Sequence, residues 1–213
     1  MSDPRDDNLG YWCAGAAARL PDKVAVVDLC GDAPRELTYG ALEARLDKVA
    51  AWSRAAGLAP GARVAMAIAN RVEFLEVFFG LMRAGVVPVP LNTKLGADTI
   101  DYIVRDSGAE GAIVDPAANP HAAAVADDLG LAAKLVLDET REGWTRYEDA
   151  LAAVPAAFDP PALSPDHPSF QPYTSGSTGR PKGVVLTHGG QMWWVRCVER
   201  YWPNAPDSRA LVA

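Results

Sequence analysis

The chain has 213 residues, 49% of them hydrophobic and 22% charged, an ordinary globular composition with room for one or two domains and one sizeable core. Its 20 basic and 27 acidic residues give a net charge of −7, which disfavours sequence-independent binding to nucleic acids and to anionic membranes. No run of about 18 apolar residues and no basic-then-apolar N-terminus is present, so the sequence predicts neither a membrane span nor a secretory signal.

The first two thirds of the chain alternate between strand and helix patterns. A short strand at 24–29 has a hairpin partner at 36–39, and Thr38 is placed to cap the helix that follows. Apolar residues at helical spacing, Leu42 and Leu46 among them, predict the buried face of that helix. Further strands are expected at 63–68, 86–90, 111–115 and 134–138, and further helices at 74–82, 98–107 and 122–129.

Several residues mark the expected ends of these helices. Gly57 and Gly85 are typical C-terminal glycines. Asn70 and Glu73 resemble a capping box, and we expect Arg71 and Glu73 to lie at a solvated helix start. Asp98 is the expected cap of the helix at 98–107, and Asp127 and Asp128 are expected on a solvated face.

The βαβαβ order predicts an α/β fold with a largely parallel sheet, in which ligands bind beyond the carboxyl ends of the strands. We expect residues 1–154 to form an N-terminal α/β subdomain. Five prolines mark residues 155–169 as a surface connector, and residues 170–213 then begin a second, incomplete α/β subdomain.

The second part contains a Gly/Ser/Thr loop between two apolar strands. The strands are expected at 170–173 and 184–187, followed by a helix at 188–202 and a strand beginning at 209–213. His188 is expected to be a polar cap rather than a catalytic base. We expect Trp193 and Trp194 to be packing residues rather than the lining of an acyl tunnel.

The loop 174–183 has the composition of a phosphate-binding segment. Gly176, Gly179 and Gly183 permit positive φ and close backbone approach to a ligand, and the backbone N–H groups and hydroxyls supply donors. Lys182 adds a full positive charge, and Arg180 adds another. A flexible linker is the alternative, which the apolar flanks and Pro181 disfavour. A P-loop is a minor alternative, because Lys182 is followed by glycine and not by Ser or Thr.

The run from Thr174 to Gly183, TSGSTGRPKG, resembles the signature of the acyl-adenylate-forming superfamily, which contains acyl-CoA synthetases, peptide-synthetase adenylation domains and luciferases. Residues 37–42 and 80–92 resemble two earlier segments of that superfamily. The form Pro90-Leu91-Asn92 is more similar to acyl- and aryl-CoA ligases than to peptide adenylation domains. The resemblance runs from about the first helix to the last residue.

This resemblance implies a two-step reaction with ATP, Mg²⁺ and coenzyme A, in which a carboxylic acid becomes an acyl-AMP and then a thioester. It favours a fatty or related acyl acid. The loop would hold the β- and γ-phosphates, with Lys182 stabilising the charge that develops there. By motif position, the residues that contact phosphate or shape the loop are Thr174, Ser175, Gly176, Ser177, Thr178, Gly179 and Lys182.

Other motifs of the superfamily are missing from the chain. It contains neither the Tyr-Gly-x-Thr-Glu segment for adenine and Mg²⁺ nor the Thr-Gly-Asp segment for ribose. The resemblance places the main catalytic lysine, most ligands of Mg²⁺ and most of the acyl pocket beyond Ala213. We therefore expect the N-terminal part of a ligase that does not catalyse adenylation alone. The alternatives are a truncated ATP- or phosphate-binding module, a subunit completed by another polypeptide, and a fragment of a peptide-synthetase adenylation domain.

The cysteines and histidines give no sign of a metal site. Cys13, Cys30 and Cys197 are far apart and form no CxxC pair, and the three histidines are also scattered. We expect reduced thiols in a cytoplasmic protein with no protein-bound metal centre.

Overall fold

The computed structural model describes residues 3–175, 179–201, 208 and 210. At its centre lies a sheet of five strands in the order β4-β3-β5-β6-β7, in which each neighbouring pair is parallel. The predicted parallel α/β architecture is therefore confirmed. The strands are β3 (Arg63–Ala67), β4 (Val87–Pro90), β5 (Gly111–Val114), β6 (Ala133–Val136) and β7 (Thr145–Arg146).

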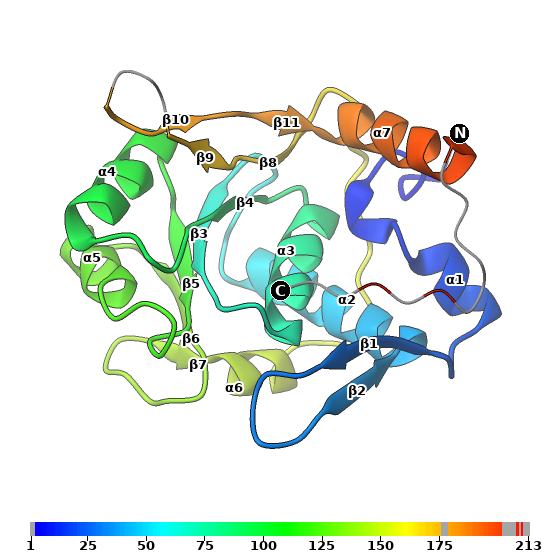
Figure 1. Cartoon of the computed structure of the whole chain (residues 1–213), viewed down its shortest axis with the longest axis horizontal. Helices are drawn as coiled ribbons and strands as arrows, with labels where there is room; N and C mark the ends of the chain where they lie inside the picture. Colours follow the sequence, from blue (N-terminus) through cyan, green and yellow to red (C-terminus); the bar gives the residue numbers. More distant parts are fainter. Residues whose placement is uncertain (1–2, 176–178, 202–207, 209, 211–213) are drawn as a thin grey trace.

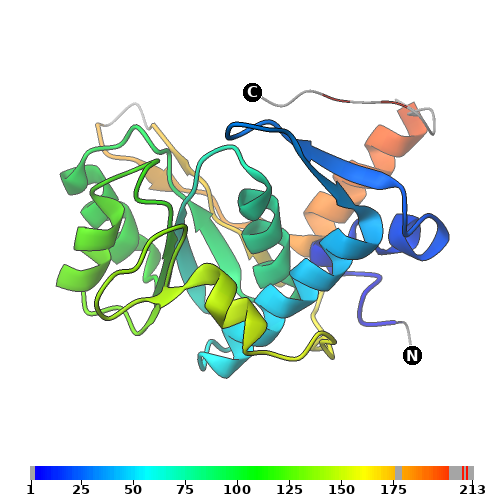
Figure 2. The same ribbon diagram turned by 90° about the horizontal axis from the view of Figure 1, so that it is seen from below.

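Helices cover both faces of this sheet (Figures 1 and 2). Along β3, Val64 and Met66 belong to a core shared with α2, α3 and α6, whereas Ala65 and Ala67 belong to a second core shared with α4 and α5. Successive side chains of a strand point to opposite faces, so a strand covered on both sides is apolar almost throughout. The helices are α2 (Tyr39–Ala55), α3 (Val72–Arg83), α4 (Ala97–Ser107), α5 (Ala122–Asp128) and α6 (Tyr147–Ala152).

Helices α2 and α3 pack closely at Gly80. A Cβ atom at this position would lie 2.5 Å from the Cβ of Val49 and 2.9 Å from the carbonyl oxygen of Leu46, both on α2. No real Cβ tolerates such distances, so the missing side chain sets how near the two helices approach. The helices α3 and α4 then lead the chain to β4 and β5, which flank β3 on its two sides.

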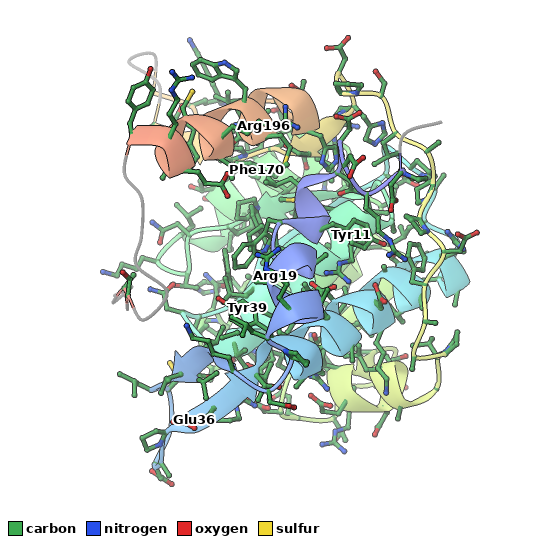
Figure 3. The ribbon with its side chains drawn as sticks, turned by 90° about the vertical axis from the view of Figure 1, so that its right-hand side faces the viewer. Tyr11, Arg19, Glu36, Tyr39, Phe170 and Arg196 are labelled. Atoms are coloured by element: carbon green, nitrogen blue, oxygen red, sulfur yellow. The ribbon has the colours of Figure 1, made fainter. Side chains whose placement is uncertain are left out.

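The N-terminal segment is held to α2 and α3 by the buried Arg83. Its Nε donates to the carbonyl of Gly10 at 2.9 Å, and its guanidinium pairs with Glu43 at 2.5 Å and Asp47 at 2.6 Å. A charge can be buried when its donors are satisfied in this way. Figure 3 shows this segment, with Tyr11 and Arg19, between α7 and the β1–β2 hairpin. The elements are η1 (Leu9–Tyr11), α1 (Ala14–Arg19), β1 (Val24–Asp28) and β2 (Arg35–Thr38).

Three of the predicted helix ends are confirmed. The side chain of Thr38 caps α2 by accepting a hydrogen bond of 3.2 Å from a backbone N–H of the first turn. Gly57 and Gly85 have φ of +81° and +74° at the ends of α2 and α3, as C-terminal glycines should. The prediction for Asp98 is wrong, because the N-cap of α4 is Gly96 and Asp98 lies in the first turn.

The start of α3 also differs from the prediction. The helix begins after Arg71 rather than Asn70, and the carboxylate of Asp28 in β1 accepts a hydrogen bond of 3.0 Å from its first backbone N–H. Glu73 is only 3% exposed and pairs with Arg35 at 2.7 Å and Arg71 at 2.6 Å. The expected solvated helix start is therefore a buried ionic cluster, formed because the β1–β2 hairpin covers it.

Asp127 is likewise not simply solvated. Its carboxylate accepts hydrogen bonds from Lys134 at 2.7 Å, Arg141 at 2.8 Å and the indole of Trp144 at 2.8 Å. Burial would raise the pKa of Asp127, but these three donors outweigh it and lower the pKa to about 2. The neighbouring Asp128 is exposed, as expected.

After α6 the chain runs without helix or strand from 153 to 167 and then forms two short antiparallel pairs. They are β8 (Pro168–Phe170) with β11 (Leu186–Thr187), and β9 (Tyr173–Thr174) with β10 (Lys182–Gly183). The backbone N–H of Gln171 donates to the carbonyl of Pro88 at 3.0 Å, which fixes this segment beside β4.

Helix α7 (His188–Tyr201) confirms the predicted C-terminal helix. Trp193 and Trp194 are 66% and 58% exposed, so the described residues do not provide the packing that we expected for them. The strand expected at 209–213 falls, apart from Ala210, outside the described residues. In the described ranges, none of the helices combines the length and the apolar sequence needed to cross a bilayer.

Candidate functional site

The loop singled out in the sequence is the tip of an antiparallel hairpin. Lys182 pairs with Thr174, and Gly183 pairs with Tyr173. The predicted arrangement of strand, loop and strand is therefore present, although each strand is shorter than expected. We refer to residues 173–183 as the signature hairpin; its strands β9 and β10 lie above α4 in Figure 1.

The described residues of the signature hairpin present donors to solvent. Thr174, Ser175 and Lys182 are exposed, and Gly179 has φ of +92°, which glycine adopts without strain. Within residues 3–175 and 179–201, no ion pair joins Lys182 to a carboxylate. The other predicted contact residues, Gly176, Ser177 and Thr178, lie outside the described residues.

The main catalytic lysine cannot be placed on this structure. The family resemblance puts it beyond Ala213, the last residue of the sequence, and Ala213 itself lies outside the described residues. Its position therefore stays a prediction. Among the residues named from the signature, Lys182 is the one whose charge the structure places at the hairpin.

Gly183 has a different role from the close approach to a ligand that we expected. A Cβ atom there would lie 2.6 Å from Nε2 of Gln171 and 2.9 Å from Cζ of Tyr173. Its missing side chain therefore makes room for two side chains at the base of the hairpin. Gln171 in turn accepts a hydrogen bond of 2.9 Å from Arg63, the first residue of β3.

A depression of about 640 Å³ separates α4 from the loop of the signature hairpin. Three carboxylates line it, against only two guanidinium groups, so it carries a net negative charge that disfavours a polyphosphate. The exposed face of Thr174, Ser175 and Lys182 is the better candidate for an anion. The carboxylates belong to Asp98, Asp101 and Asp106, and the guanidiniums to Arg105 and Arg180.

A second depression, of about 440 Å³, lies at the carboxyl ends of β3 and β4, where the sequence predicts ligand binding in such a sheet. Asn70, Phe74 and Asn92 are among its lining residues, and no charged side chain lines it. Its lining is therefore neutral, in contrast to the depression beside α4.

His188 is not the polar cap that we expected. It is fully buried, and its Nδ1 accepts a hydrogen bond of 3.0 Å from the backbone N–H of Leu9. Thr187 instead caps α7 by accepting a hydrogen bond of 3.2 Å from the N–H of Gly190. Burial, and then the neighbouring His167, lowers the pKa of His188 to about 4, so the ring is neutral and holds the N-terminal segment against α7.

Among the described residues, no three His, Cys, Asp or Glu side chains gather in a way that could hold a metal ion. The cysteines Cys13, Cys30 and Cys197 are all free thiols.

Comparison with known proteins supports the interpretation of the signature. The family model for AMP-binding enzymes matches residues 13–213. A feruloyl-CoA synthase from Amycolatopsis sp is 38% identical over 211 residues, which is 98% of this chain and 39% of the relative. A long-chain-fatty-acid–CoA ligase from Mycobacterium tuberculosis is 34% identical over 186 residues, covering 85% of this chain and 35% of the relative.

A similar solved structure is ATP-bound MatB from Rhodopseudomonas palustris, with a TM-score of 0.77 and 30% identity, covering 94% of this chain and 39% of that one. The chain thus spans under two fifths of the length of the relatives it matches. Together, the signature hairpin, the layered α/β fold and the match over residues 13–213 show that this chain belongs to the AMP-binding, acyl-adenylate-forming enzyme family.

Proposed function

We propose that this chain is the N-terminal part of an ATP-dependent carboxylate–CoA ligase and that its signature hairpin binds the β- and γ-phosphates of ATP. The observation that carries the proposal is the exposed Lys182, without an ionic partner among the described residues, opposite Thr174 at the mouth of a glycine-containing loop. The similar ATP-bound structure supports the choice of nucleotide.

The proposed reaction begins when a carboxylate oxygen attacks the α-phosphate of ATP. The bond from the α-phosphorus to the bridging oxygen breaks, and pyrophosphate leaves with additional negative charge. Lys182 stabilises this charge, and the hydroxyls of Thr174 and Ser175 donate to the same oxygens. A thiolate, proposed to be that of coenzyme A, then attacks the acyl carbon of the acyl-AMP and displaces AMP, giving the thioester.

Residues 1–213 carry the phosphate hairpin but not the adenine and ribose motifs that the family resemblance implies. We therefore propose that they do not catalyse adenylation without further sequence, supplied either in the same polypeptide beyond Ala213 or by a complementing one.

We also retain residues 155–169 as the proposed boundary between two subdomains. ATP would bind as its Mg²⁺ complex, and the three free thiols are compatible with a reducing cytoplasm.

Two classes of carboxylic acid are proposed as substrates. The relatives named above are a feruloyl-CoA synthase and a long-chain-fatty-acid–CoA ligase, so aryl and fatty acids both belong in an assay panel. The form Pro90-Leu91-Asn92 favours coenzyme A over a peptide-synthetase carrier thiol as the acceptor.

Carboxylate-dependent exchange of pyrophosphate into ATP tests the proposal. We expect no exchange above background by residues 1–213 alone with ferulate, benzoate or a long-chain fatty acid. In a polypeptide extended by the missing motifs, we expect exchange with one acid class, lost in Lys182→Ala. Exchange by residues 1–213 alone would contradict the proposed division of the site. An extended polypeptide whose exchange is unaffected by Lys182→Ala would contradict the role of the hairpin.

A further inference from the structure

The base of the signature hairpin is tied to α4 by a short chain of hydrogen bonds. The hydroxyl of Tyr173 in β9 donates to Oδ2 of Asp106 on α4 at 2.6 Å. The same hydroxyl accepts a hydrogen bond of 3.2 Å from Nε2 of Gln171, whose Oε1 accepts from Nε of Arg63 at 2.9 Å. The chain therefore runs from the first residue of β3 to the last turns of α4.

The loop side of the hairpin reaches the same carboxylate by a second route. The guanidinium of Arg180 lies 5.2 Å from the centre of the Tyr102 ring, a distance at which a cation is attracted by an aromatic face. The hydroxyl of Tyr102 lies 3.4 Å from Oδ1 of Asp106. Asp106 follows Tyr102 by one turn of α4, so the two side chains lie on the same side of the helix. Each carboxylate oxygen of Asp106 thus faces one tyrosine hydroxyl. Tyr173 is part of the signature hairpin, and Tyr102 contacts the hairpin through Arg180.

These contacts lie next to the residues that present donors. Tyr173 directly precedes Thr174 in β9, and its ring would lie 2.9 Å from a Cβ at Gly183, which directly follows Lys182 in β10. The ring of Tyr173 thus lies at the base of the hairpin, close to the strand positions of both Thr174 and Lys182.

We propose that Asp106 is a positioning residue for phosphate binding: through Tyr173 and Tyr102 it holds the signature hairpin against α4, with Lys182 and Thr174 in register for the nucleotide. This inference rests on the proposed function of the hairpin. Asp106 itself would touch no substrate and would act only through the two tyrosines.

The protonation of Tyr173 supports the direction of the hydrogen bond. Burial, and then the bond to Asp106, raises the pKa of Tyr173 above its ordinary value, so the phenol keeps its proton and donates. A charge-assisted bond of this kind is shorter and stronger than one between neutral groups. Removing the carboxylate leaves both phenols without this acceptor.

Amide hydrogen exchange and ATP titration of the same variants test the proposal. Asp106→Ala removes the acceptor, Asp106→Asn keeps an oxygen acceptor without the charge, and Tyr173→Phe removes the donor. Asp101→Ala is the matched control, because Asp101 lies on the same helix, is partly exposed and pairs with Arg105 rather than with the hairpin.

We expect Asp106→Ala and Tyr173→Phe each to speed amide exchange in the described part of the hairpin, residues 173–175 and 179–183, and to weaken ATP binding about 3- to 10-fold. The double variant should be no worse than the stronger single variant, since both remove the same bond. Asp106→Asn should recover part of the loss, and Asp101→Ala should match the wild type in both measurements.

Two results would overturn the proposal. One is hairpin exchange in Asp106→Ala equal to that in Asp101→Ala. The other is unchanged ATP affinity in Asp106→Ala while Lys182→Ala loses binding, in which case the proposed function of the hairpin would stand. If Lys182→Ala instead binds ATP as the wild type does, the proposed function fails, and with it the nucleotide part of this inference. The exchange data would then still report whether Asp106 fixes the hairpin.

Discussion

The buried ring of His188 makes the stability of this chain sensitive to mild acid. Its Nδ1 accepts the backbone N–H of Leu9 at 3.0 Å, so a proton added to Nδ1 would face another N–H group. Burial and the stacked His167, 5.9 Å away between ring centres, lower the pKa of His188 from 6.5 to about 4. The unfolded chain, with the ordinary pKa, therefore takes up the proton first as the pH falls.

Because the unfolded chain is protonated first, acid lowers the stability of the folded chain. The contribution of His188 to stability is fully present above pH 6.5 and is lost as the pH falls from 6.5 towards 4. Between pH 7 and pH 5 the free energy of unfolding falls by about 2 kcal/mol. In this range the folded ring stays neutral while the unfolded ring becomes charged, and each pH unit below the unfolded pKa then costs about 1.4 kcal/mol.

Urea unfolding at pH 7 and pH 5 measures this loss. In His188→Asn, the amide oxygen can replace Nδ1 as acceptor but does not titrate, so we expect lower stability at pH 7 and a pH-dependent loss smaller by about 2 kcal/mol. The exposed His121→Asn is the control and should keep the wild-type pH dependence. An equal pH-dependent loss in the wild type and His188→Asn would refute this account of His188.

Two further predictions concern packing and capping, both measured as the free energy of unfolding in urea. Gly80→Ala should cost about 1–3 kcal/mol because its Cβ would overlap Val49, whereas Gly15→Ala, in a helix with space for the methyl group, should gain up to about 1 kcal/mol. Equal effects of the two would contradict the close approach of α2 and α3. Asp28→Ala should cost about 1–2 kcal/mol through the lost cap of α3, and Asn70→Ala less than about 0.5 kcal/mol. The reverse order would restore Asn70 as the cap.

The sequence predicts the sheet well, because its signal is local. The segments of β3, β5 and β6 are rich in apolar residues, and the helices between them carry apolar residues at helical spacing, so these elements follow from the pattern, whereas β7 and α6 are not predicted by it. Thr38 and the two C-terminal glycines are also local signals, and the structure confirms them.

The incorrect predictions concern residues whose contact partners lie far away in the sequence. Asp28 caps a helix that begins 44 positions later, and the β1–β2 hairpin that carries it buries Glu73. His188 is buried by an N-terminal segment 179 positions away. A pattern in a short stretch of sequence cannot include partners this far apart. The local sequence therefore predicts a cap or a solvated face for these residues.

In the candidate site, too, local sequence predicts some residues and gives no sign of others. The signature predicts Lys182 and its hairpin, whereas Asp106 and Tyr102 carry no local sign of a relation to it. The general rule for parallel sheets also directs attention to the carboxyl ends of the strands. Yet the hairpin is fastened through Gln171 to Arg63, at the opposite end of β3. Only the folded chain brings these residues together.

The most direct test of the central claim is calorimetric titration of the chain with ATP, comparing the wild type with Lys182→Ala and with Lys94→Ala as a control at an exposed lysine outside the hairpin. If the signature hairpin binds the β- and γ-phosphates, the loss of one ammonium group should weaken ATP binding at least about tenfold in Lys182→Ala and leave Lys94→Ala unchanged. Equal dissociation constants for the wild type and Lys182→Ala would contradict the claim.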